Sequence, residues 1–123
     1  MKDIKYLGVP NLCFSLTDKD DHREEKFKKQ REERGFDDSE TWSLRDTYVN
    51  FMIPRLEVFI ERSCGCPIGI TFEEWDIILK KILWSLKFIQ EQDSKATIPT
   101  NKEWRQYKQG MNLLSKWFQN LWW

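Results

Sequence analysis

The chain offers few residues whose type and spacing suit metal binding or redox chemistry. Its three cysteines are an odd number, and Cys64 and Cys66 have a single residue between them, where zinc-binding and redox motifs usually have two. The single histidine, His22, lies in a run of charged residues, so a Cys/His site would need ligands from distant segments. We therefore predict no metal site and no cofactor, and we expect reduced thiols.

Carboxylates are the other candidates for chemistry. They cluster at 37–40 and 73–76, and both clusters fall where helices are expected to begin. Acids at a helix start complement the helix dipole and cap free N–H groups, which accounts for them without catalysis. The sequence contains no phosphate-binding loop, zinc-protease motif, nucleophile elbow or dinucleotide fingerprint, and Cys64 has no neighbouring histidine to activate it. We predict a protein that is not an enzyme and has no catalytic residues.

Length and charge limit the kinds of partner. A chain of 123 residues is long enough for one domain with a core of its own. Its 20 basic and 20 acidic residues balance, so no global field attracts nucleic acid, anionic lipid or an acidic substrate. The N-terminus lacks a continuous apolar leader, and no stretch approaches about 18 uninterrupted apolar residues, so we expect neither secretion nor a membrane span.

Apolar periodicity and capping residues predict a mainly α fold. We expect one domain, 1–123, built as a small bundle of about four helices behind an extended N-terminal arm. Thr71 with Glu74 and Thr100 with Glu103 have the spacing of capping boxes. Gly35 is expected to end a helix, because glycine is the usual C-terminal cap residue. The expected elements are the arm (1–16), a charged helix (17–35), a helix kinked at Pro54 (39–62), a central helix (72–91) and a C-terminal helix (100–122).

Aromatic residues outnumber what one small bundle easily covers. The central helix is apolar on two faces, and Trp84 lies on the second of them. In the C-terminal segment KWFQNLWW, Phe118 and Leu121 continue the three- and four-residue apolar spacing of the C-terminal helix, whereas the tryptophans do not. These tryptophans either pack on the arm or form an interface, and we expect a homo-oligomer. The predicted partner-interface residues are Trp84, Trp117, Trp122 and Trp123.

Two kinds of ligand site remain open. Trp42, Arg45 and Arg55 flank the expected kink, where a ring could stack on a nucleotide base and cations could hold its phosphates. The C-terminal helix also carries bases beside aromatic rings, as single-strand binders do, but three bases are few. Trp42, Arg45 and Arg55 are our hypothesis for a nucleotide-ligand site, and we do not expect nucleic acid as the main partner.

One stretch of the chain resembles a known group of proteins. TWSLRDTYVNFMIPRL, a Gly65–Pro67 loop and EEWDIILKKILWSLKFI are similar, over about residues 35–90, to small uncharacterised proteins of tailed phages. That group has an acid-T-W-S-[LM]-D-x-T-[LI]-A segment, then [IL]-x-P-x-L, G-x-P and E-W-D-x-[IL]-L-x-x-M-I-W-x-F. Arg45 departs from this pattern, because the group has an acid there. The matching residues are Thr41, Trp42, Ser43, Leu44, Thr47, Pro54, Leu56, Pro67, Trp75, Asp76, Leu79 and Trp84.

The resemblance implies a phage protein made in the cytoplasm of an infected bacterium. Small phage accessory proteins without catalytic motifs often act by binding. We therefore expect a non-enzymatic protein that counters host defence, either by sequestering a nucleotide immune signal or by blocking a defence protein. A structural or self-assembling interaction protein and a single-stranded nucleic-acid binder are the alternatives.

Overall fold

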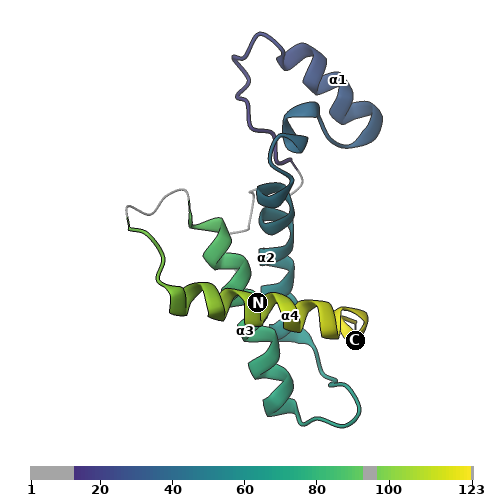
Figure 1. Ribbon diagram of the computed structural model, residues 1–123. Coiled ribbons are helices and arrows are strands. Elements are labelled where there is room, and N and C mark those ends of the chain that lie inside the picture. The colour runs from purple at the N-terminus through teal and green to yellow at the C-terminus, as the bar shows by residue number, and fades with distance from the viewer. Residues whose placement is uncertain (1–12, 93–96, 123) are drawn as a thin grey trace. The chain divides into compact units, whose positions relative to one another are not determined.

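The protein is mainly α-helical. The structure is a computed structural model that describes residues 13–92 and 97–122 (Figure 1). Within these ranges it has four α-helices, two short 3₁₀-helices and no strand. The predicted fold class, a small mainly α bundle of about four helices, is confirmed. Most of the predicted N-terminal arm lies outside the described residues, as does Trp123.

The chain divides into two compact units. Unit 1 ends at Phe51 and unit 2 begins at Met52, so the boundary falls inside helix α2 (Leu44–Arg62). Unit 1 also contains α1 (Glu24–Arg34) and the 3₁₀-helix η2 (Asp38–Thr41), while unit 2 contains α3 (Phe72–Gln90), α4 (Asn101–Trp117) and the 3₁₀-helix η4 (Phe118–Asn120). The expectation of one domain over the whole chain stays a prediction.

Helix α1 is shorter than the charged helix expected at 17–35. It begins at Glu24, because side chains before it bond to backbone N–H groups locally, in competition with the helix. Asp18 accepts from the N–H of Asp20 at 2.9 Å, and Asp21 accepts from that of Arg23 at 2.8 Å. Hydrogen bonds from the Arg23 side chain and backbone lower the pKa of Asp21 to about 2.

The C-terminal end of α1 agrees with its sequence. Gly35 has a φ of 89°, the left-handed conformation that favours glycine, and its N–H donates to the carbonyl of Arg31. Phe27 is the single buried residue of this highly charged helix. Glu24 pairs with Arg31 across two turns at 2.6 Å.

The helix expected at 39–62 is two elements. Residues Asp38–Thr41 form η2, and α2 then runs from Leu44 to Arg62 with Pro54 inside it. Asp37 caps η2, because its carboxylate accepts from the N–H of Ser39 at 2.9 Å while Glu40 accepts from the N–H of Asp37 at 2.7 Å. This capping box closes a single 3₁₀ turn before α2 starts, so the acidic cluster at 37–40 does serve as a cap.

Helices α3 and α4 begin at the predicted capping boxes. Thr71 and Glu74 exchange backbone-to-side-chain bonds of 2.9 and 3.1 Å, and Thr100 and Glu103 do the same at 2.9 and 3.1 Å. The C-terminal helix predicted at 100–122 is shorter, because α4 ends at Trp117 and η4 follows it. No helix in the described part of the chain is long and apolar enough to cross a membrane.

Unit 2 has a core centred on α3. Helix α4 crosses α3 (Figure 1), and α3 supplies most of the buried apolar side chains of unit 2. At the crossing, the hydroxyl of buried Ser85 donates to the carbonyl of Tyr107 at 3.0 Å, beside Gly110. Lys87 on α3 pairs with Glu57 on α2 at 3.0 Å. The buried apolar residues of α3 are Trp75, Leu79, Ile82, Leu86, Phe88 and Ile89.

Candidate apolar docking groove

Unit 1 contains an open apolar cavity, which we call the unit 1 groove. Its volume is about 640 Å³. Its walls come from the segment before α1, the turn after α1, η2 and the first turns of α2. The lining residues are Phe14, Gly35, Phe36, Glu40, Thr41, Leu44, Thr47, Tyr48 and Phe51.

Large apolar side chains of the groove are open to solvent. Leu44 is 66% exposed, and Phe36, Tyr48 and Phe51 are 42% to 45% exposed. Leu44, Tyr48 and Phe51 are spaced by four and three residues, so they lie on one face of α2. Their spacing is that of a helix packed on a core, yet in the described part of unit 1 this face stays open. Phe14 contacts it edge-on, with its ring centroid 6.4 Å from that of Phe51.

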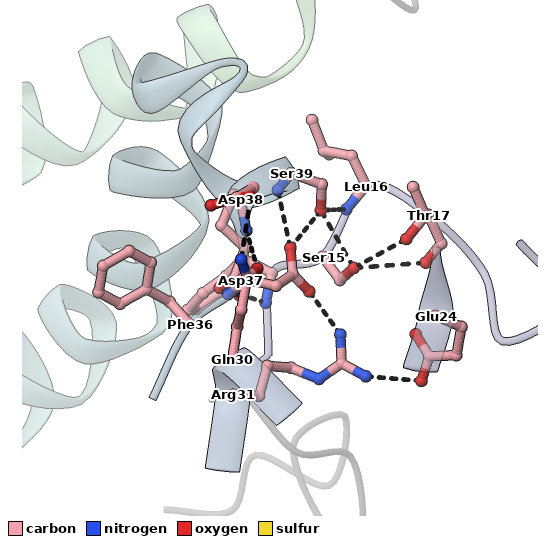
Figure 2. Close-up of polar contacts among 12 residues, drawn as sticks. Ser15, Leu16, Thr17, Glu24, Gln30, Arg31, Phe36, Asp37, Asp38 and Ser39 are labelled. Carbon is pink, nitrogen blue, oxygen red and sulfur yellow. Dashed lines mark hydrogen bonds and ion pairs between the residues drawn. The ribbon is translucent and has the colours of Figure 1, made fainter. Parts of the chain in front are cut away.

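A buried polar network holds the walls of the groove in place (Figure 2). Ser39 is its centre: its hydroxyl donates to the Asp37 carboxylate at 2.6 Å and accepts from the backbone N–H of Leu16 at 2.9 Å. The Ser15 hydroxyl lies 3.1 Å from that of Ser39. Asp37 and Ser39 are fully buried. These bonds attach the segment before α1 to η2.

Arg31 joins the same network from α1. Its guanidinium lies between two carboxylates, bonding to Glu24 at 2.6 Å and to Asp37 (Figure 2). Burial raises the pKa of Asp37, but hydrogen bonds from Ser39, Ser15 and Arg31 outweigh it and hold that pKa below its ordinary value. Burial lowers the pKa of Arg31, and its bonds with Asp37 and Glu24 outweigh this and raise it. Both groups are therefore charged near neutral pH, which stabilises the pair.

Glu40 links the network to the groove itself. One of its carboxylate oxygens accepts from the backbone N–H of Phe14 at 3.1 Å, and the other accepts from the N–H of Asp37 at 2.7 Å. The hydroxyl of Thr47 donates to the Glu40 carbonyl at 2.7 Å, which ties η2 to α2. Since both oxygens already accept backbone N–H groups, Glu40 acts as a structural cap and orients Phe14. This geometry gives no support to a role as a general base.

Cations are absent from the lining of the groove, which contains no lysine or arginine among its described residues. Two arginines adjoin lining residues in the sequence. Arg45 pairs with Asp46 at 3.2 Å, and Arg34 has its guanidinium 4.3 Å from the centre of the Phe36 ring and bonds to Asp38 at 2.7 Å. Both charges are therefore already engaged. The groove suits an apolar ligand better than a phosphate, which needs unengaged cations or N–H groups around it.

The predicted ligand residues fall into different units. Trp42 and Arg45 belong to unit 1, and Arg55 belongs to unit 2, where it lines a small cavity of about 140 Å³ with Met52, Leu56, Phe59 and Leu121. Arg45 is exposed and pairs with Asp46 at 3.2 Å. The cation beside exposed Trp42 is Arg23, 5.0 Å from its ring centre, which the sequence analysis did not identify. A long-range contact of this kind leaves no spacing signal in the sequence.

The predicted partner-interface tryptophans have separate environments in unit 2. Trp84 is partly buried and stacks on Phe88, with ring centroids 5.1 Å apart. Trp117 packs edge-on against buried Trp75 at 5.7 Å. Trp122 is 75% exposed and lines a second cavity, whereas Trp123 lies outside the described residues. Of the described three, Trp122 is the most available to a partner.

Comparison with known proteins adds no further constraint. No protein-family model, curated protein or solved structure matches the chain. Within residues 13–92 and 97–122, no three His, Cys, Asp or Glu side chains are grouped so that they could hold a metal ion. The resemblance to small phage proteins stays a prediction, and the case for function rests on the geometry above.

Proposed function

We propose that this chain is a non-enzymatic binding protein whose unit 1 groove docks an apolar segment of another protein. In line with its resemblance to small tailed-phage proteins, we propose a host defence protein as the target, blocked in the cytoplasm of the infected bacterium. The observation that carries the proposal is the open face of Leu44, Tyr48 and Phe51 above a cavity of about 640 Å³.

The make-up of the groove supports a protein partner. Protein interfaces combine an apolar, aromatic-rich centre with a polar rim, and here Thr41 and the hydroxyl of Tyr48 accompany the apolar side chains. Burying a side chain such as Leu44 contributes about 1.5–3 kcal/mol, so two or three of them give a usable docking energy. A matching occupant is the apolar face of an amphipathic helix, which presents side chains at the same three- and four-residue spacing.

The alternative of sequestering a nucleotide receives less support. A nucleotide carries phosphates, and the lining of the groove supplies no cation. Trp42 has a guanidinium beside it, but that of Arg23 also bonds to Asp21 at 3.0 and 3.1 Å. We therefore favour the blocking of a protein over the capture of a nucleotide signal. The predicted homo-oligomer remains part of the proposal, with Trp122 as its most exposed candidate residue.

Site-specific photocrosslinking tests the docking surface. Benzoylphenylalanine replaces Leu44 in one chain and Ile68, which is fully exposed in unit 2, in a matched control. Each chain is expressed in the bacterial cytosol and irradiated, and adducts are identified by mass spectrometry. We expect a heterologous protein adduct from position 44 that position 68 does not give.

Reconstitution then decides the proposal. The crosslinked protein is purified and titrated calorimetrically with the parent chain, with Leu44→Glu and with Ile68→Glu. We expect Leu44→Glu to weaken binding by at least about tenfold and Ile68→Glu to change it little. Adducts confined to the chain itself, a co-purifying nucleotide lost on denaturation, or turnover of nucleotide by the pure protein would each overturn the proposal.

A further inference from the structure

Unit 2 contains a second cavity at which two cysteines meet tryptophan side chains. We call it the thiol cavity. Its volume is about 240 Å³, and it brings together the loop before α3, the first turn of α3 and the residues that follow α4. The lining residues are Cys64, Gly65, Cys66, Pro67, Trp75, Asn120 and Trp122.

The two thiols at this cavity differ in exposure. Cys64 is exposed, whereas Cys66 is partly buried, with its sulfur 3.5 Å from the carbonyl oxygen of Ile70. Both are free thiols. A reagent from solution therefore meets Cys64 first, because attack on a disulfide needs an accessible sulfur.

The loop has room to bring the two sulfurs together. Gly65 is the single residue between the cysteines, so their Cα atoms are at most about 7 Å apart even in an extended chain. A disulfide needs a Cα separation of about 4.4–6.8 Å, which a modest bend at Gly65 provides. The space beside Gly65 is open, since a Cβ there would meet no atom within 4 Å. Closure therefore needs a bend of the loop at Gly65 and the loss of the Cys66 contact with the Ile70 carbonyl.

We infer that Cys64 is a thiol-modification site for low-molecular-weight disulfides such as glutathione disulfide, with Cys66 as the resolving thiol. The Cys64 thiolate attacks one sulfur of the small disulfide, forms a mixed disulfide and releases one small thiolate. The Cys66 thiolate then attacks the Cys64 sulfur, forms the Cys64–Cys66 disulfide and releases the second small thiolate. Two protein thiols are oxidised, one small disulfide is reduced, and the two protons pass to the released thiolates or to solvent.

The cavity gives this site a place for the incoming group. The cavity lining includes the rings of Trp75 and Trp122, which would pack against the carbon chain of the small thiol, and the amide of Asn120, which would bond to its peptide groups. Cys13 provides an internal comparison, because it is also an exposed thiol but has no second cysteine near it in the sequence. The inference does not depend on the unit 1 groove.

The test uses the full chain and glutathione disulfide as the probe. In Cys13→Ser, we expect intact-mass spectra to show a transient mixed disulfide and then a species two hydrogens lighter than the reduced chain. In Cys13→Ser with Cys66→Ser, the mixed disulfide should accumulate at Cys64. In Cys13→Ser with Cys64→Ser, an adduct at Cys66 should form at least about tenfold more slowly, because that thiol is less exposed.

Tryptophan fluorescence provides an independent readout of the cavity. Adduct formation at Cys64 should change the emission, and Trp122→Phe should reduce that change. The inference is overturned if Cys13→Ser forms no intramolecular disulfide, or if Cys64 and Cys66 react at equal rates in the single-cysteine chains. It is also overturned if, in the parent chain, Cys13 takes up glutathione while Cys64 and Cys66 both stay reduced.

Discussion

Gly110→Ala is the change that most directly probes the packing of α3 on α4. A methyl group at this position would overlap the hydroxyl of Ser85, and it would lie 2.6 Å from the carbonyl oxygen of Lys81 and 2.7 Å from the Ser85 Cβ. The Ser85 hydroxyl could rotate away, but the backbone carbonyl cannot. The two helices must therefore separate to admit the methyl group.

The expected magnitude comes from opposing effects. Alanine is favoured over glycine in a helix by about 1 kcal/mol, which alone would stabilise the variant. Overpacking against a backbone atom costs about 3 kcal/mol, the upper end of the usual range. A displaced Ser85 also loses its bond to the Tyr107 carbonyl, 3.0 Å long in the parent, at a cost of about 1 kcal/mol. The net expectation is destabilisation of unit 2 by about 3 kcal/mol.

Urea unfolding followed by tryptophan fluorescence measures this change. Trp42 is the only tryptophan of unit 1, so the signal reports mainly on unit 2. Asn112→Ala on the exposed side of α4 is the control, with an expected gain of about 0.5 kcal/mol. Ser85→Gly added to Gly110→Ala should restore part of the loss, because the Lys81 carbonyl stays in the way. A Gly110→Ala chain as stable as the parent would refute the close approach of the helices.

Further predictions concern unit 1. Asp37→Asn leaves the Arg31 guanidinium without its most buried partner, and we expect unit 1 to lose about 3 kcal/mol of stability in thermal unfolding followed by circular dichroism. Because the pKa of Asp37 is lowered in the folded chain, its contribution is complete above the ordinary value of 3.8 and is lost as the pH falls through the lower folded pKa. Acid titrations of the parent should therefore show a loss of stability below about pH 4 that is smaller in Asp37→Asn; equal slopes would contradict the assignment. Gly35→Ala should cost about 1 kcal/mol because its φ is 89°, and a neutral result by the same unfolding measurement would argue against the left-handed cap.

Local patterns in the sequence were sufficient for the helices and several of their ends. Thr71 with Glu74, and Thr100 with Glu103, predicted the starts of α3 and α4, and Gly35 predicted the end of α1. These signals work because a cap bonds to backbone groups within three or four residues, so its energy depends little on the rest of the fold.

Local competition and tertiary contacts explain where the sequence analysis was wrong about boundaries. The charged segment before Glu24 has helical composition, yet Asp18 and Asp21 bond to nearby N–H groups and delay α1. In the region expected to start a longer helix, the buried contacts of Asp37 and Glu40 close η2 as a separate turn. Propensity alone does not decide between such alternatives, because their energies differ by little.

Only the tertiary structure decided which apolar and polar residues are buried. Leu44, Tyr48 and Phe51 have the three- and four-residue spacing of a packed helix face, but such spacing says which residues share a face and not whether anything covers it. The Arg31–Asp37 pair, the Arg23–Trp42 contact and the approach of Gly110 to Ser85 join residues from separate elements. The sequence by itself therefore determined the helices, through local hydrogen bonds, whereas the groove and the close packing arose from contacts that form only when those helices meet.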